Sequence, residues 1–312
     1  MDHSPDQPLD LFSTLLMTLV CTIWGGAFVA IKIGLLDMPP LGSAALRFLL
    51  TTLVLLIWAR LQHVPLLYQG PEVRVLAVIA FLFFSFNLMV YLGTARTTSG
   101  RATVFFYTQP VFLAVLAHYF LPGDSLTLRK GCGLILAMAG LVVLFLDKLG
   151  ARHSSTVLGD LLVLSGALAT ATQNLIIKRA AGKIHPVALV FWGTVVSALL
   201  LGVGWWEFEQ NAAVLFSTRA IASVLYLSLI SAAFGFVAFA WLLQHNSATR
   251  VIALVFLAPV FGVLFAWLLL HETLTSLQLL GVVGVCAGVY IVSSGGGPQV
   301  KALLSEEVPA KA

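Results

Sequence analysis

Polar side chains interrupt several apolar stretches of this sequence at spacings that place them together on one helical face. Asn87 and Tyr91 are four residues apart, and Thr170, Gln173 and Asn174 follow the i, i+3, i+4 pattern. Residues at these spacings are neighbours on a helix surface. Amide and hydroxyl groups at membrane depth mark binding sites, although they also join helices by hydrogen bonds. The pattern therefore predicts a binding cavity, with helix–helix hydrogen bonding as the alternative.

Aromatic side chains extend this candidate site to other stretches. Trp24 and Tyr107 lie within apolar runs. For Trp24 and Tyr91 the alternatives are packing or a place in an interfacial aromatic belt. Gln109 is two residues from Tyr107, so in a regular helix the two side chains cannot both point inward. The predicted substrate-binding residues are Trp24, Asn87, Tyr91, Tyr107, Thr170, Gln173 and Asn174.

Catalytic motifs are missing from the sequence. It contains no HExxH, no GxSxG and no acidic metal cluster, so we expect no catalytic residue, metal or cofactor. Ser99 or Ser165, each followed by glycine, with His118 or His245 as base, would make an intramembrane serine hydrolase, the weaker alternative function. A channel-like facilitator is the stronger alternative.

The composition is that of a membrane protein. Of 312 residues, 60% are hydrophobic and 10% are charged, and the mean hydropathy is +1.01. Soluble domains carry about 25% charged residues. The surface of this protein must therefore lie largely against membrane lipid. The formal charge of +4 is small and scattered, which argues against nucleic-acid binding. Three cysteines in apolar runs indicate packing and not disulfide bonds.

Ten apolar segments have the length of about 20 residues that a membrane-spanning helix requires. They cover approximately 11–35, 41–60, 73–95, 101–121, 127–146, 157–178, 186–206, 219–243, 248–270 and 276–294. The alternation of a β-barrel is absent, so we predict an all-α membrane protein. Polar residues 1–10 are expected to form a disordered tail, and residues 295–312 a flexible one.

Residue identities recur between the two halves of the chain. At nearly constant offsets, Lys32 matches Lys178, Pro40 matches Pro186, Arg101 matches Arg250 and Thr127 matches Thr275. We therefore predict a first repeat over 11–146, a linker over 147–156 and a second repeat over 157–294. Five spans is an odd number, so the second repeat must be inverted relative to the first. Ten transmembrane helices as two inverted five-helix repeats are typical of secondary transporters with a central site.

The same alignment suggests the nature of the ligand. Thr170 and Asn174 of the second repeat match Trp24 and Phe28 of the first. One half would thus present a polar stripe and the other an aromatic stripe. Such a cavity suits a small amphiphilic molecule.

Glycines and prolines mark places where helices pack closely or bend. Gly25 and Gly26 favour close packing, with a loosened helix as the alternative. Pro110 and Pro259 remove a backbone hydrogen bond at matching places, which predicts kinks, with a hinge role second. Arg47 lies inside the second span and must meet carbonyls or water within the protein, or else an anionic group of the substrate.

A further small-residue motif lies near the end of the chain. Gly284 and Gly288 form a GxxxG pattern in the tenth span. We expect it to pack that span against a partner within the chain, with dimerisation as the alternative. The protein is accordingly expected to work as a monomer.

The longest motifs resemble the EamA-type branch of the drug/metabolite transporter superfamily. The resemblance rests on Trp24-Gly25-Gly26 with Phe28 and Lys32, on Arg47-Phe48, and on 253–292 with Pro259, Glu272, Leu274, Gly281 and Gly288. It implies a cavity lined by the first, third, fourth, sixth, eighth and ninth spans. The amino-acid exporters of the YddG type are most similar. They imply a secondary transporter that exports amino acids or related metabolites by alternating access.

Charge placement bears on orientation and on energy coupling. Most Lys and Arg lie on the flanks that are cytoplasmic if the N-terminus is inside. We therefore expect a bacterial inner-membrane protein with both termini in the cytoplasm. Every carboxylate lies in a tail, in a loop or near a span end, so we expect exchange or uniport and no proton-carrying carboxylate at the midplane. Among the histidines, His118 lies inside the fourth span and could carry a proton instead, so it is the residue to test.

Overall fold

The computed structural model describes residues 9–146, 154–270 and 275–294, and every regular element within them is a helix. The first half contains α1 (Leu11–Gly34), α2 (Pro40–Leu61), α3 (Pro71–Arg96), α4 (Ser99–Phe106), α5 (Gln109–Phe120) and α6 (Leu128–Leu144). The second half contains α8 (Ser154–Arg179), α9 (Pro186–Phe208), α10 (Thr218–Leu225), the π-helix η1 (Tyr226–Phe234), α11 (Gly235–His245), α12 (Ala248–Leu254), α13 (Leu257–Leu270) and α14 (Ser276–Ser293).

Nine segments of the described chain are long and apolar enough to cross a membrane. Three of them are composite: α4 with α5, α10 with η1 and α11, and α12 with α13. The tenth is α6, a helix of 17 residues that packs along α14. The all-α fold of ten transmembrane helices is therefore confirmed. The tails and the linker lie wholly or partly outside the described residues, so their boundaries stay predictions.

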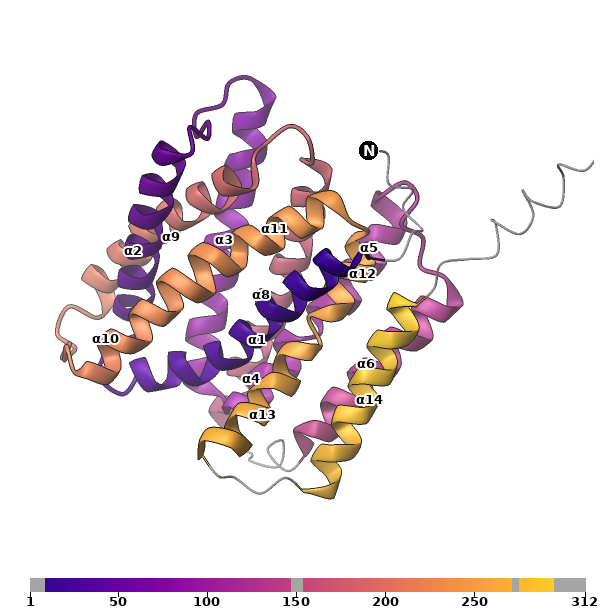
Figure 1. Cartoon of the computed structure of the whole chain (residues 1–312). Helices are drawn as coiled ribbons and strands as arrows, with labels where there is room; N and C mark the ends of the chain where they lie inside the picture. Colours follow the sequence, from indigo (N-terminus) through magenta and orange to yellow (C-terminus); the bar gives the residue numbers. More distant parts are fainter. Residues whose placement is uncertain (1–8, 147–153, 271–274, 295–312) are drawn as a thin grey trace, which may run out of the picture.

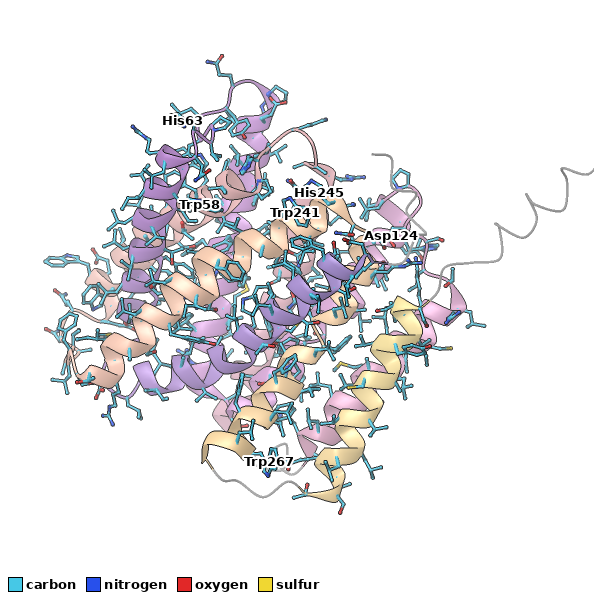
Figure 2. All side chains as sticks on the ribbon, viewed as in Figure 1. Trp58, His63, Asp124, Trp241, His245 and Trp267 are labelled. Atoms are coloured by element: carbon cyan, nitrogen blue, oxygen red, sulfur yellow. The ribbon has the colours of Figure 1, made fainter. Side chains whose placement is uncertain are left out.

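The outer surface of the bundle fits a lipid environment. Large apolar side chains such as Ile57 and Val283 are exposed at 60% and 64%. Trp58 and Trp267 are exposed near opposite ends of the bundle (Figure 2). Tryptophans at both ends of a membrane protein sit at the headgroup level. The two side chains therefore indicate where the membrane boundaries lie.

Matching residues of the two repeats occupy the same positions at the starts of helices. Pro40 and Pro186 each occupy the first position of a helix, where the missing N–H costs nothing. The Thr127 hydroxyl accepts a hydrogen bond from the Lys130 N–H at the start of α6, and Thr275 does the same at the start of α14. The repeated residues are thus helix-start signals, which explains why they recur at fixed offsets.

Helix packing follows the pattern expected of an inverted repeat, and Figure 1 shows one of its pairs, α6 alongside α14. Two helices pack on their own counterparts, α2 on α9 and α6 on α14. The contact of α3 with α8 is matched by that of the α10–η1–α11 span with α1. The contact of α1 with α13 is matched by that of α8 with α4 and α5. The principal contacts therefore run between the halves, and the two repeats interdigitate.

Glycines bring α6 and α14 together at backbone distance. A Cβ atom added to Gly140 would lie 2.5 Å from the Val285 nitrogen, and one added to Gly288 would lie 2.4 Å from the Ala137 nitrogen. A side chain at either glycine would overlap the backbone of the other helix. The GxxxG pattern thus packs the tenth span against the fifth within the chain.

The fourth and ninth spans are interrupted at equivalent places. α4 ends before Tyr107–Thr108, and α12 ends before Val255–Phe256. Pro110 and Pro259 follow shortly after, and neither can donate to the carbonyl four residues earlier. The expected kinks are therefore breaks in the two helices. A hinge role for the prolines stays a proposal.

A carboxylate joins the two halves at the end of the bundle where α1 stops. Asp37 follows α1 and accepts hydrogen bonds from Arg219 Nε at 2.5 Å, Arg219 Nη2 at 2.6 Å and Ser217 Oγ at 2.5 Å. The Leu215 N–H also donates to the Asp37 carbonyl at 2.8 Å. The hydrogen bonds from Arg219 and then from Ser217 lower the pKa of Asp37 to about 2.

This lowered pKa predicts a specific pH dependence of stability. In the unfolded chain the Asp37 carboxyl titrates near its ordinary value of 3.8. Its pKa is lower in the folded protein, so its contribution is complete above pH ~4 and is lost as the pH falls toward 2. Asp37→Asn should lower the Tm of the detergent-solubilised protein at pH 7, with a difference that shrinks below pH ~4. Thermal unfolding from pH 8 to pH 3 measures this.

The control is Glu207→Gln, which changes an exposed carboxylate at the end of α9 near the same end of the bundle. It should not alter the Tm in the same pH-dependent way. An equal effect of Asp37→Asn at pH 3 and pH 7 would contradict the assignment.

Candidate functional site

A cavity lies inside the bundle. The centre of a water-sized molecule can occupy about 100 Å³ of it. One water needs about 10–15 Å³ by this measure, so the space holds several waters or a small organic molecule. Residues from α1, α2, α3, α4, α5, α8, α9, η1 and α11 line it. Most of the lining surface is apolar, as is usual in small-molecule sites.

The seven residues predicted from helical faces all border this one cavity. They are Trp24, Asn87, Tyr91, Tyr107, Thr170, Gln173 and Asn174. Trp24 is half-buried and the other six are buried. The structure thus brings them together, and their role in substrate binding remains a proposal.

Trp24 belongs to an aromatic wall. Its indole Nε1 donates to the Ser231 carbonyl at 3.2 Å, so the polar edge of the ring is satisfied within the protein. Its ring centroid lies 5.6 Å from that of Phe236 and 5.2 Å from that of Phe239. Phe83 and Phe86 continue this wall on α3. Such a surface can hold the apolar part of a ligand.

Asn87, Thr170, Gln173 and Asn174 make no side-chain hydrogen bond to another helix within the described part of the chain. Asn87 Nδ2 donates to the Phe83 carbonyl at 2.8 Å and Thr170 Oγ1 to the Gly166 carbonyl at 2.8 Å, both within their own helix. Gln173 Oε1 and Asn174 Nδ2 are buried and have no hydrogen-bond partner among the residues described. Buried polar atoms are nearly always hydrogen-bonded. These two are therefore available to a ligand, which favours the cavity interpretation over helix–helix hydrogen bonding.

Two further polar residues line the cavity but were not among the predicted binding residues. Gln109 is exposed by only 4%, and its Oε1 has no partner. Arg47 is also exposed by only 4%, and its Nε has no partner. Both residues line the cavity.

The expectation that Tyr107 and Gln109 cannot both face inward is wrong. Both line the cavity because the helix is interrupted between them, at Tyr107–Thr108. The i, i+2 argument holds only for an unbroken helix. Pro110 was the signal in the sequence that could have corrected it.

The ninth span contributes no lining residue among those described, although the family resemblance implied that it would. The second span contributes Arg47, and the seventh contributes Leu189 and Val190. Packing explains the difference, because α13 lies tightly against α1. A Cβ atom added to Gly25 would be 2.8 Å from the Gly262 nitrogen. The glycine therefore serves close helix packing.

Gly26 packs elsewhere on α1. A Cβ atom added to it would be 2.8 Å from the Tyr226 hydroxyl. Tyr226 in turn donates to the Ile23 carbonyl. Both glycines of the pair thus permit contacts between α1 and the second half.

Among the described residues, the cavity wall includes no Asp, Glu, His or Lys. Asp160 is buried but pairs with Arg101, whose Nε lies 3.1 Å from Asp160 Oδ2. His118 is exposed, and its Nδ1 accepts from the Leu126 N–H at 3.2 Å. Glu272 lies outside the described residues. Of the residues that the structure describes, Arg47 alone brings a charged group to the cavity wall.

Acidic Asp124 lies at the opposite end of the bundle from Asp37, near the start of α12 (Figure 2). It accepts from Ser247 Oγ at 3.1 Å and from the Thr249 N–H at 3.0 Å. At both ends of the bundle, away from the cavity, a carboxylate of the first half thus accepts hydrogen bonds from residues of the second half.

Comparison with protein families gives a clear result. Residues 11–146 and residues 157–294 each match the model of the EamA-like transporter family. The two matches place the same family unit twice along the chain.

Individual relatives agree with the family match. A probable amino-acid metabolite efflux pump of Escherichia coli is 32% identical over 287 residues, covering 89% of this chain and 93% of that protein. The uncharacterized transporter YoaV of Bacillus subtilis is 28% identical over 273 residues, covering 87% and 93%. A crystal structure of another protein has the same fold, with a TM-score of 0.78 and 19% identity, over 95% of this chain and 99% of that one.

Proposed function

Because this chain belongs to the EamA-like transporter family, we propose that it exports amino acids or similar small amphiphilic metabolites by alternating access around the central cavity. The chain is a multi-pass membrane transporter and not an enzyme. The amino-acid substrate, the direction and the mechanism belong to the proposal. So do the bacterial inner membrane, the cytoplasmic termini and the monomeric state.

One observation carries the amino-acid substrate. The cavity offers buried polar atoms without partners, on Arg47, Gln109, Gln173 and Asn174, together with an aromatic wall that contains Trp24. A molecule with a compact polar head and an apolar side chain satisfies both surfaces at once. The E. coli relative, a probable amino-acid metabolite efflux pump, supports the same class of substrate.

The packing symmetry supports alternating access. Contacts of the α3–α8 kind recur as contacts between α1 and the α10–η1–α11 span. Two equivalent sets of contacts can open and close at opposite ends with similar energies. The cavity would then face each side of the membrane in turn.

Flux measurements in proteoliposomes test this function. We expect radiolabelled amino acids from a panel of small metabolites to show saturable uptake and counterflow. Flux that does not saturate and shows no counterflow would indicate a channel and contradict the proposal.

The same vesicles test energy coupling. The described cavity wall has no group that titrates near neutral pH, so a pH gradient alone should not drive accumulation. We expect His118→Ala to transport at the wild-type rate at every pH, because His118 lies on the exposed surface. Uphill accumulation that disappears in His118→Ala would establish proton coupling and refute exchange or uniport.

A further inference from the structure

The Arg47 side chain is a buried cation that the described protein does not neutralise. It is exposed by 4%, and no carboxylate pairs with it among the described residues. Its Nη1 donates to the Tyr91 hydroxyl at 3.3 Å, and its Nε finds no partner in the described part of the chain. Burial of a charge is costly unless the charge is paired and hydrogen-bonded. An anion that arrives from the cavity would supply the missing counter-charge.

The surroundings of Arg47 hold the guanidinium in place without neutralising it. The group lies over the ring of Phe48 at 5.0 Å and that of Phe236 at 5.9 Å from the centroids. The Arg47 carbonyl accepts from Thr51 and Ser228, at 2.9 Å and 3.1 Å. The hydrogen bonds fix the Arg47 backbone, and the two aromatic rings orient its guanidinium group. They leave the Nε–H group, which has no partner among the described residues, able to bind a ligand.

Tyr91 completes the anion site. Its hydroxyl accepts from Arg47, so its own proton can donate onward. A guanidinium N–H and a phenol O–H on one side of a cavity can both donate to the two oxygens of a carboxylate.

We infer that Arg47 and Tyr91 bind the carboxylate of the substrate, and that the cavity selects monoanionic carboxylates while an amino group is accepted but not required. The inference rests on the proposed function for the identity of the cargo. Charge balance carries it: one cation lines the cavity and no anionic residue does, among those described. A monoanion neutralises the site, whereas a dianion such as phosphate would leave net negative charge buried.

The uncharged polar groups that also line the cavity explain why the amino group is optional. Gln109 and Gln173 offer amide oxygens that can accept from an ammonium group but carry no charge to pair with it. The binding energy is therefore expected to depend strongly on the carboxylate and weakly on the amine. This pattern separates the site from one that recognises both ends of a zwitterion.

A matched series of four ligands tests the inference by thermal-shift titration of the purified protein. The series is leucine, isocaproate (which lacks the amine), leucinamide (which lacks the carboxylate charge) and isopentylamine (which lacks the carboxylate). Leucine and isocaproate should stabilise the protein with Kd values within about tenfold of each other. The amide and the amine should bind about tenfold to a hundredfold more weakly. Equal binding of leucinamide and leucine, or no binding of either acid, would overturn the inference.

Variants separate ligand recognition from structural support. Arg47→Met should weaken isocaproate binding about tenfold to a hundredfold while the ligand-free Tm stays the same or rises, because an unpaired buried charge is removed. Arg47→Lys should retain part of the affinity, and Tyr91→Phe should lose part of it. Wild-type isocaproate affinity in Arg47→Met would overturn the inference, whatever its Tm.

Flux distinguishes this inference from the proposed function. If the acids bind in an Arg47-dependent way but no metabolite is transported, the function fails and the carboxylate site stands. If amino-acid flux is saturable and equal in wild type and Arg47→Met, the function stands and the carboxylate site fails.

Discussion

Leucine in place of Asn174 lowers the transport rate about tenfold to a hundredfold, while the amount of folded protein in the membrane stays nearly constant. The Nδ2 atom of Asn174 is buried at the cavity and has no hydrogen-bond partner in residues 9–146, 154–270 and 275–294. Its loss therefore breaks no hydrogen bond to Nδ2 within the described part of the fold but removes a donor from the ligand site. Asn87→Leu should also lower transport, at an added stability cost of about 0.5–1.5 kcal/mol, because Asn87 Nδ2 bonds to the Phe83 carbonyl.

Two matched controls exist on the same helices. Thr172→Leu on α8 and Ser85→Leu on α3 also replace a small polar side chain by leucine, and neither residue lines the cavity. Initial rates in proteoliposomes, normalised to reconstituted protein, give the comparison. If both asparagine variants transport at the wild-type rate while the controls lose flux, the substrate site has been misplaced.

Alanine in place of Gly140 destabilises the protein by about 1–3 kcal/mol. The added Cβ atom would lie 2.5 Å from the Val285 nitrogen, 2.7 Å from the Gly284 carbonyl carbon and 2.9 Å from the Gly281 oxygen. All three are backbone atoms of α14, so no side-chain rotation relieves the overlap. The two helices must separate, and α6 loses the contacts that hold it in the bundle.

Gly131→Ala is the matched control on the same helix, because a Cβ atom at Gly131 meets no described residue within 4 Å. Alanine is the better helix former, so this variant should be stabilised by about 0.5–1 kcal/mol. Thermal unfolding in detergent measures both changes. A Gly140→Ala protein as stable as Gly131→Ala would show that the close approach of α6 and α14 is not maintained in solution.

The fold could be predicted because its signals are local and occur twice. Pro40 with Pro186 and Thr127 with Thr275 mark helix starts that the structure confirms. An odd number of spans then fixes the relation between the halves. The packing partners could not be obtained this way, since α6 and α14 recognise each other through glycine positions far apart in the sequence.

The candidate site was reached by helical periodicity and was incomplete where periodicity fails. Asn87 with Tyr91, and Thr170 with Gln173 and Asn174, lie on unbroken helices, where the face argument applies. Gln109 follows a break and therefore points to the same cavity as Tyr107. Arg47 stands alone on α2, so no spacing pattern marked it.

The pairing of α6 with α14 has a consequence for biosynthesis. The ribosome delivers α6 to the membrane well before α14 has been translated. Until then the glycine-lined face of α6, including Gly133 and Gly140, has only lipid against it, and small side chains make few contacts with lipid chains. Assembly can therefore be completed only after translation of the last described helix. A nascent chain interrupted before α14 is left with an unfilled groove that membrane quality control can recognise.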